Sequence, residues 1–258
     1  MREELGAGWT VGDPLGSVQR DSRPALPKRF YATAGAEARD SGFALMLDGR
    51  AARTPGKRPL AFPTQALAEA VAREWAAQGE LIDPRTMPLT RLVNSAIDGV
   101  AQTMEATRAD MAGYAGTDLM CYRAASPEAL AALQAAAHDP VLDWAHEALG
   151  ARFVVTQSVM HVRQPDSTLA VVRAALEAVE DPFALAALHV QTTLTGSVIL
   201  ALAVAHGRLN PDEAWRAAHV DEDFQISQWG EDDEAMIRRA ARWLEMQAAA
   251  QMLLLGRA

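Results

Sequence analysis

One short segment near the middle of the chain contains the residue types that could do metal or acid–base chemistry. Two histidines and three acidic residues lie close together there: His138, Asp139, Asp143, His146 and Glu147. Imidazole and carboxylate groups bind zinc and act as general acids and bases, and residues three apart share one face of a helix. Such residues are also common on solvated helices. The segment therefore allows one hypothesis, a small metal-dependent or acid–base enzyme that uses His138, Asp143 and His146.

Other signatures of catalysis are missing from the sequence. Gly56-Lys57 lacks the preceding glycine and the following Ser or Thr of a phosphate-binding loop, and neither G-x-S-x-G nor H-E-x-x-H occurs. Cys121 is the only cysteine, which excludes an intramolecular disulfide and a CxxC site. No nucleophile has an evident base nearby. We therefore expect no cofactor, no metal and no enzymatic activity.

Two further polar groups are better explained by structure than by chemistry. Asp118 could cap a helix or pair with Arg123 at a helix junction, although the same residues could contact a partner. The sequence from 189 to 193 places His189, Gln191 and Thr192 in a helical segment, where we expect them to form internal hydrogen bonds.

A stretch near the end of the chain, residues 211–235, combines apolar and acidic residues at helical spacing. Asn210 and Pro211 predict a helix start, and Gly230 predicts its end. Wound as one unbroken helix, residues 211–229 place Trp215, Ala218, Ile226 and Trp229 on one face, with Glu222 in its middle. A carboxylate there is either paired in the core or kept for a partner, because burying it alone is costly.

The opposite face of the same helix carries Val220 and Phe224, so the helix is either enclosed or offers one face to another molecule. The acidic cluster that follows suits a helix start, and Glu234 could pair with Arg238. Our hypothesis is that this stretch binds a partner protein through Glu222 and its neighbours. The candidate partner-binding residues are Asp221, Glu222, Gln225, Trp229, Glu231, Asp232 and Glu234.

The elements that position these residues predict an α+β fold. After an N-terminal arm over residues 1–27, four short strands are expected at 30–33, 43–48, 51–54 and 59–62, with Asp48-Gly49 as a hairpin turn. They would form a small antiparallel, barrel-like β domain at 28–63. A multihelical domain would occupy residues 64–258.

Start and stop signals divide the helical part. Thr64, Met87-Pro88, Pro127 and Asp181-Pro182 each predict a helix start. We expect helices at 64–79, 88–104, 128–137, 140–149, 167–180 and 182–206, the last being the central core helix, and a strand-like interruption at 153–156 that could continue at 159–162.

Bulk properties limit the class of protein. The chain has 258 residues, half of them apolar, and a net charge of −9, which argues against nucleic acid as a partner. The longest apolar run, residues 194–205, is shorter than the roughly 20 residues of a membrane span. The first residues do not resemble a secretory signal or a mitochondrial presequence. We expect a protein of the bacterial cytoplasm, without membrane insertion and monomeric when free.

The sequence also resembles the family of assembly chaperones for the ATP synthase alpha subunit, from about residue 27 to the end. Seven segments in the same order carry the resemblance: Pro27-Lys28-Arg29-Phe30-Tyr31; Leu47-Asp48-Gly49-Arg50 with Thr54-Pro55; Glu74-Trp75 with Gln78; Met87-Pro88-Leu89-Thr90; Thr117-Asp118-Leu119 with Tyr122-Arg123-Ala124; Asp139-Pro140 with Trp144; and Asp221-Glu222, Gln225, Trp229-Gly230-Glu231-Asp232 and Glu234-Ala235.

This resemblance implies a chaperone that binds the newly made alpha subunit, keeps it soluble and releases it when the beta subunit arrives. It implies the same division into a β domain and a helical domain, and it requires no nucleotide or metal. Eukaryotic relatives would act in the mitochondrial matrix.

Overall fold

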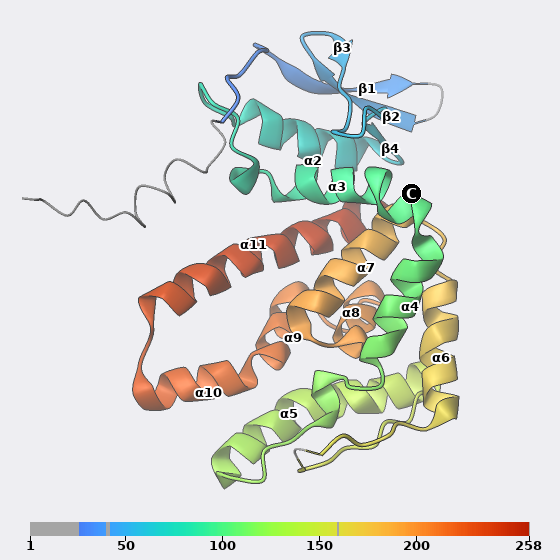
Figure 1. Cartoon of the computed structure of the whole chain (residues 1–258), viewed down its shortest axis with the longest axis vertical. Coiled ribbons are helices and arrows are strands. Elements are labelled where there is room, and N and C mark those ends of the chain that lie inside the picture. Colours follow the sequence, from blue (N-terminus) through green and yellow to red (C-terminus); the bar gives the residue numbers. More distant parts are fainter. Residues whose placement is uncertain (1–25, 40–41, 159, 258) are drawn as a thin grey trace, which may run out of the picture.

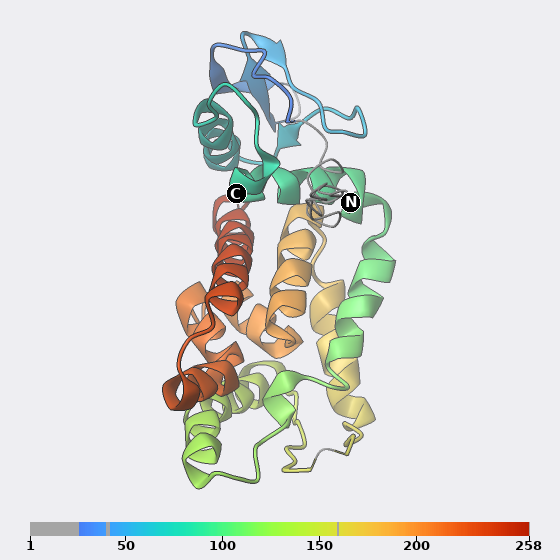
Figure 2. The ribbon, with the colours of Figure 1, turned by 60° about the vertical axis from the view of Figure 1, so that its left-hand side comes forward.

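The structure is a computed structural model, and it describes residues 26–39, 42–158 and 160–257. The predicted N-terminal arm lies almost wholly outside these residues. The described chain is elongated, with a small sheet at one end and helices over the rest (Figures 1 and 2). Among its helices, none has the length and hydropathy needed to cross a membrane.

The sheet is antiparallel and open, so the barrel-like closure that we predicted is wrong. Strand β2 lies in its middle, with β1 on one side and β3 and β4 on the other. The short outer strands cannot meet each other to close a barrel. The strands are β1 (Ala34–Arg39), β2 (Gly42–Leu47), β3 (Arg50–Ala51) and β4 (Ala61–Phe62).

The hairpin turn at Asp48-Gly49 is confirmed, because both residues have positive φ and Leu47 pairs with Arg50. The predicted strand at 30–33 is wrong, and the first strand begins at Ala34. The Asp48 carboxylate accepts hydrogen bonds from the backbone N–H groups of Ala32 and Thr33, at 3.0 and 2.8 Å. These donors are therefore used by a side chain, and they lower the pKa of Asp48.

Helices α2 (Gln65–Ala76) and α3 (Pro88–Asp98) lie beneath the sheet (Figure 1). Thr64 caps α2 as predicted, accepting from the backbone N–H of Leu67. The start of α3 has no local side-chain cap. Its N–H groups at Leu89 and Thr90 donate instead to the carboxylate of Glu74 in α2, at 2.8 and 2.7 Å. This contact joins the start of α3 to α2.

The remaining helices form the body of the molecule, in which α7 packs against α3, α4 and α11. A hydrogen bond from the Thr64 hydroxyl to the carbonyl of Leu255 joins the end of α11 to the start of α2. The elements are η1 (Pro84–Thr86), η2 (Val100–Gln102), α4 (Met104–Tyr114), η3 (Leu119–Cys121), α5 (Glu128–Trp144), the π-helical turn η4 (Ala145–Leu149), α6 (Asp166–Glu177), α7 (Pro182–Thr195), α8 (Val198–Ala205), α9 (Pro211–Ala218), α10 (Val220–Trp229) and α11 (Asp233–Leu255).

Two predicted helices are each broken by a glycine. The helix expected at 88–104 ends before Gly99, and the one expected at 182–206 ends at Gly196, whose φ is +68°. Ser197 then caps α8 by accepting from the backbone N–H of Leu200. The apolar pattern runs through the break at Gly196 because both sides of it are buried, whereas the residues after Gly99 are half-buried or exposed.

The predicted division of a helix at Pro140 is also wrong, since α5 runs through it from residue 128 to 144. Proline removes one N–H donor but leaves φ helical, and the π-helical turn and Gly150, with φ +81°, end the element instead. The expected strand at 153–156 is only one isolated bridge, between Thr156 and Tyr122. The helix expected at 167–180 is confirmed as α6.

Gln191 in the middle of α7 does not form the internal hydrogen bonds that we expected. Its side chain is fully buried, and neither its oxygen nor its nitrogen has a hydrogen-bond partner among the described residues. Its neighbours behave as predicted, because Thr192 donates to the carbonyl of Leu188 and His189 contacts Asp110. An unpaired buried amide destabilises the fold.

Replacing Gln191 by leucine should therefore stabilise the protein. Leucine removes two unpaired polar atoms and adds apolar contact, so we expect the free energy of unfolding to rise by about 1–2 kcal/mol. Denaturant unfolding of Gln191→Leu measures this. Thr193→Leu, which alters an exposed residue of the same helix, is the control. A lower unfolding midpoint for Gln191→Leu would contradict the expectation.

Candidate functional site

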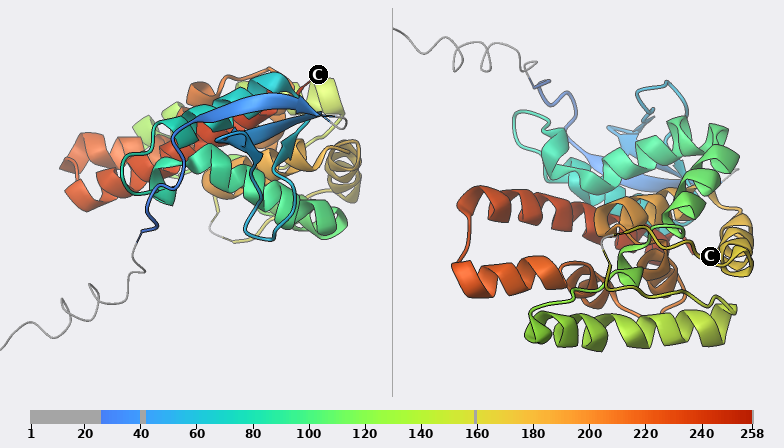
Figure 3. Two further views of the ribbon diagram at one scale, coloured as in Figure 1. Left: turned by 90° about the horizontal axis from the view of Figure 1, so that it is seen from above. Right: turned by 60° about the horizontal axis from the view of Figure 1, so that its bottom comes forward.

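Helix α10 and the first half of α11 form a helical arm that projects from the body (Figures 1 and 3). We call residues 220–241 the arm, because the next residues of α11 contact the body: Arg242 donates to the Leu194 carbonyl and Trp243 packs against Trp215. Residues 220–229 include no buried side chain, and neither do residues 233–245, whereas the second half of α11 contributes Met246, Ala249 and Met252 to the core. Helices in proteins are usually stabilised by a packed face. The exposed arm is therefore available for contact with another molecule.

The arm displays large apolar side chains as well as charges. Trp229 is 80% exposed and Ile237 is 71% exposed. Single exposed apolar residues are common on protein surfaces. Several of them on one projecting element indicate an interaction surface.

The helix from 211 to 229 is not continuous, which corrects our prediction that Trp215 and Trp229 share a face. His219 interrupts it, with φ −115° and ψ 20°. Its ring lies 3.9 Å from the Trp215 ring and its Nδ1 is 2.7 Å from the Trp215 carbonyl oxygen. Trp215 consequently packs in the core, and Trp229 is turned to the surface.

A cleft of about 430 Å³ separates α10 from α11. It brings together four of the seven candidate residues: Glu222, Gln225, Trp229 and Asp232. The other three do not line it. Asp221 points to α5 and accepts from Gln134 at 2.6 Å, Glu234 pairs with Arg238 as predicted at 3.1 Å, and Glu231 is exposed beside the cleft.

The charge of Glu222 is available within this cleft. Its side chain is 54% exposed, and the nearest cationic group among the described residues is His219, with 3.9 Å between Nε2 and Oε2. Burial lowers the pKa of His219, so that ring is neutral at pH 7. The neighbouring Asp223, by contrast, is paired with Arg239 at 2.5 Å. Glu222 is therefore not the partner of a core ion pair.

Asp232 has a structural role, because its carboxylate caps α11 by accepting a hydrogen bond from the backbone N–H of Ala235 at 2.8 Å.

The histidine-rich segment does not assemble a metal or acid–base site. His138 is buried, with Nδ1 2.8 Å from the Arg123 guanidinium and Nε2 2.7 Å from the Ala217 carbonyl oxygen, so both ring nitrogens are occupied. Arg123 pairs with Asp139 at 2.8 Å, not with Asp118. Within residues 26–257, apart from the gaps in the description, no three potential metal ligands come together.

The single thiol is equally unsuited to catalysis, since burial raises the pKa of Cys121 to about 12.

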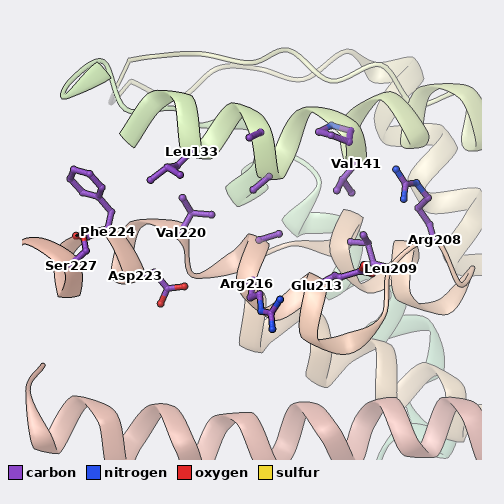
Figure 4. Close-up of a pocket in the computed structure, with 14 residues that line it drawn as sticks. Leu133, Val141, Arg208, Leu209, Glu213, Arg216, Val220, Asp223, Phe224 and Ser227 are labelled. Atoms are coloured by element: carbon purple, nitrogen blue, oxygen red, sulfur yellow. Dashed lines mark hydrogen bonds between the residues drawn. The ribbon is translucent and has the colours of Figure 1, made fainter. Parts of the chain in front are cut away.

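Sequence reasoning missed an apolar groove on the other side of α10. Figure 4 shows Val220 and Phe224 of α10 facing Leu133 of α5, with Val141 of α5 farther along the groove, near Leu209. The groove has a volume of about 660 Å³. The sequence did place Val220 and Phe224 on the helix face opposite Trp229. It left open whether that face is enclosed or is offered to another molecule. The structure shows them half-buried along this groove.

Comparison with known proteins places these features in a family. Residues 28–146 match the family model described as ATP12 chaperone protein. The chain is 45% identical to Atp12 from Paracoccus denitrificans, with a TM-score of 0.84, over 89% of this chain and 98% of that one, and a point mutant of the same protein matches equally well. It is 46% identical to the Atu1473 protein of Agrobacterium tumefaciens, described as a candidate chaperone, with a TM-score of 0.87, over 96% of this chain and 93% of that one.

Proposed function

Because this chain belongs to the ATP12 chaperone family, which acts in ATP synthase assembly, we propose that its client is the free alpha subunit of the catalytic head. The chain would hold that subunit soluble in the bacterial cytoplasm and hand it over to the beta subunit. It would act as a monomeric binding protein and not as an enzyme.

The exposed arm is the observation that carries this proposal. A ring subunit without its neighbours exposes apolar flanks that aggregate. A chaperone that binds such a flank must dissociate from it again. This favours an interface of moderate area, with an apolar centre and a charged rim. Trp229 and Ile237 supply the apolar part, and Glu222 supplies an unpaired carboxylate for a basic residue of the client.

We propose the same contact residues as those predicted from the sequence, but we do not expect all of them to contribute equally to client binding. Glu222, Gln225 and Trp229 line the cleft directly. Asp232 and Asp221 are held by contacts within the chain, and Glu231 and Glu234 lie at the edge of the arm. We therefore assign the main contact to the first three.

Aggregation of purified alpha subunit tests the proposed function. The subunit is diluted from denaturant with and without this chain, and light scattering is followed. We expect near-equimolar chain to suppress the scattering, and added folded beta subunit to release the alpha subunit into a complex. Purified beta subunit, diluted in the same way, is the control client. Unchanged scattering of alpha, or equal protection of beta, would overturn the proposal.

A further inference from the structure

The groove between α5 and α10 has the length and lining of a helix-binding site. On α5 its wall includes Leu133, Ala137 and Val141, spaced four residues apart. At 1.5 Å per residue this wall is about 12 Å long, which matches two turns of a helix. Leu133 is 50% exposed, so the wall is open to solvent. The small side chains of Ala137 and Ala217 let a second backbone come close.

The rim of the groove has two cationic groups that are free to bind an anion. Arg208 and Arg216 are exposed and form no ion pair among the described residues. The rim carboxylates are occupied, Asp223 by Arg239 at 2.5 Å and Glu213 by the backbone N–H of Asn210 at 2.8 Å. In a chain of net charge −9, this groove therefore favours an occupant with acidic residues at its edge.

We propose that this groove binds an amphipathic helical segment of the client, with apolar residues at i, i+3 or i+4 and i+7 and carboxylates beside them. This mode of recognition places an apolar stripe in a groove between helices. The inference rests on the proposed function. It extends the client interface, since α10 forms one wall of the groove and one wall of the cleft beside α11. A single client molecule would then contact α10 on two faces, in the groove beside α5 and in the cleft beside α11.

A charged residue in the groove should weaken client binding selectively. We expect Leu133→Glu to raise the Kd for purified alpha subunit at least about tenfold, because it places a carboxylate where apolar side chains are buried. Leu254→Glu is the matched control, since Leu254 is 73% exposed and lies at the far end of α11. It should change the Kd less than about twofold. Thermal melts of both variants show that each is folded.

The outcomes separate this inference from the proposed function. If the unmodified chain binds no alpha subunit, both are overturned. If it binds, and Leu133→Glu binds equally well or Leu254→Glu loses as much, the groove inference alone is overturned.

Photo-crosslinking identifies the occupant. The native Cys121 is buried, so a benzophenone maleimide reacts selectively with Leu133→Cys. We expect a crosslink to an apolar, acidic-edged helical segment of the alpha subunit, and none from the same probe on Leu254→Cys. A crosslink to a second copy of this chain, or none from Leu133→Cys, would overturn the inference.

Discussion

Replacing Glu222 by lysine should abolish most capture of the alpha subunit without unfolding the chaperone. Glu222 is more than half exposed, and its one ion-pair contact among the described residues is with His219, which is neutral at pH 7. Replacing Glu222 therefore leaves no buried charge unpaired. The lysine would lie in a cleft already lined by Arg238, Arg239 and Arg242, and it would repel a basic client. We expect affinity to fall at least about thirtyfold, or roughly 2 kcal/mol. Binding titrations with labelled alpha subunit measure it.

Glu177→Lys is the control for this charge reversal. Glu177 is exposed in the last turn of α6, where a cation is favourable, and α6 lies on the opposite side of the body from the arm (Figure 1). Full binding by folded Glu222→Lys would refute the assignment. An unfolded Glu222→Lys would mean that the carboxylate serves the fold, contrary to its exposure.

Helix and turn starts were predictable wherever one residue and its immediate neighbours supply the hydrogen bonds. The turn at Asp48-Gly49 and the helix starts at Thr64, Pro182 and Pro211 all occur as expected, each stabilised by a local cap or by positive φ at the turn. The family could be recognised from the sequence partly because some of its characteristic residues stabilise the fold. Several of the resemblance segments are structural, such as Glu74, which caps α3.

The continuity of helices was not predictable, because distant residues decide it. The break at Gly196 is stabilised by Ser197 and by Asp118, and Asp118 lies some 80 residues away in the sequence. At the break at His219 the histidine ring stacks on Trp215, which is close in sequence but is held in the core by contacts such as that with Trp243 of α11. A break shifts the phase of every later side chain. For that reason the sequence predicted that residues 211–229 are helical but placed Trp229 on the wrong face.

Asp118 shows how strongly such a distant contact can hold the fold. Its side chain is fully buried, which excludes the alternative that it contacts a partner. One carboxylate oxygen accepts from the N–H of Met120 at 3.0 Å and the other from the N–H of Ile199 at 3.2 Å. It thus caps η3 and α8 together. Burial outweighs these hydrogen bonds and raises the pKa of Asp118 to about 6.

Asp118→Ala should therefore be among the most destabilising single substitutions. It leaves at least two buried N–H donors without an acceptor, and we expect a loss of about 3 kcal/mol at pH 7. Asp166→Ala, which removes an exposed carboxylate from the first turn of α6, should cost less than about 0.5 kcal/mol. Denaturant unfolding of both variants provides the measurement. Equal midpoints for Asp118→Ala and the unmodified chain would show that α8 needs no cap from Asp118.

The same comparison has a pH dependence whose sign follows from the raised pKa. A carboxyl group with a higher pKa in the folded chain binds its proton more tightly there, so its contribution is fully present below the unfolded value of 3.8 and is lost as the pH rises through about 6. Alanine cannot titrate. The stability advantage of the unmodified chain over Asp118→Ala should thus be about 1 kcal/mol larger at pH 5 than at pH 7.5. An advantage that grows with pH would mean that Asp118 is ionised in the folded chain throughout, because its hydrogen-bond donors outweigh the cost of burial.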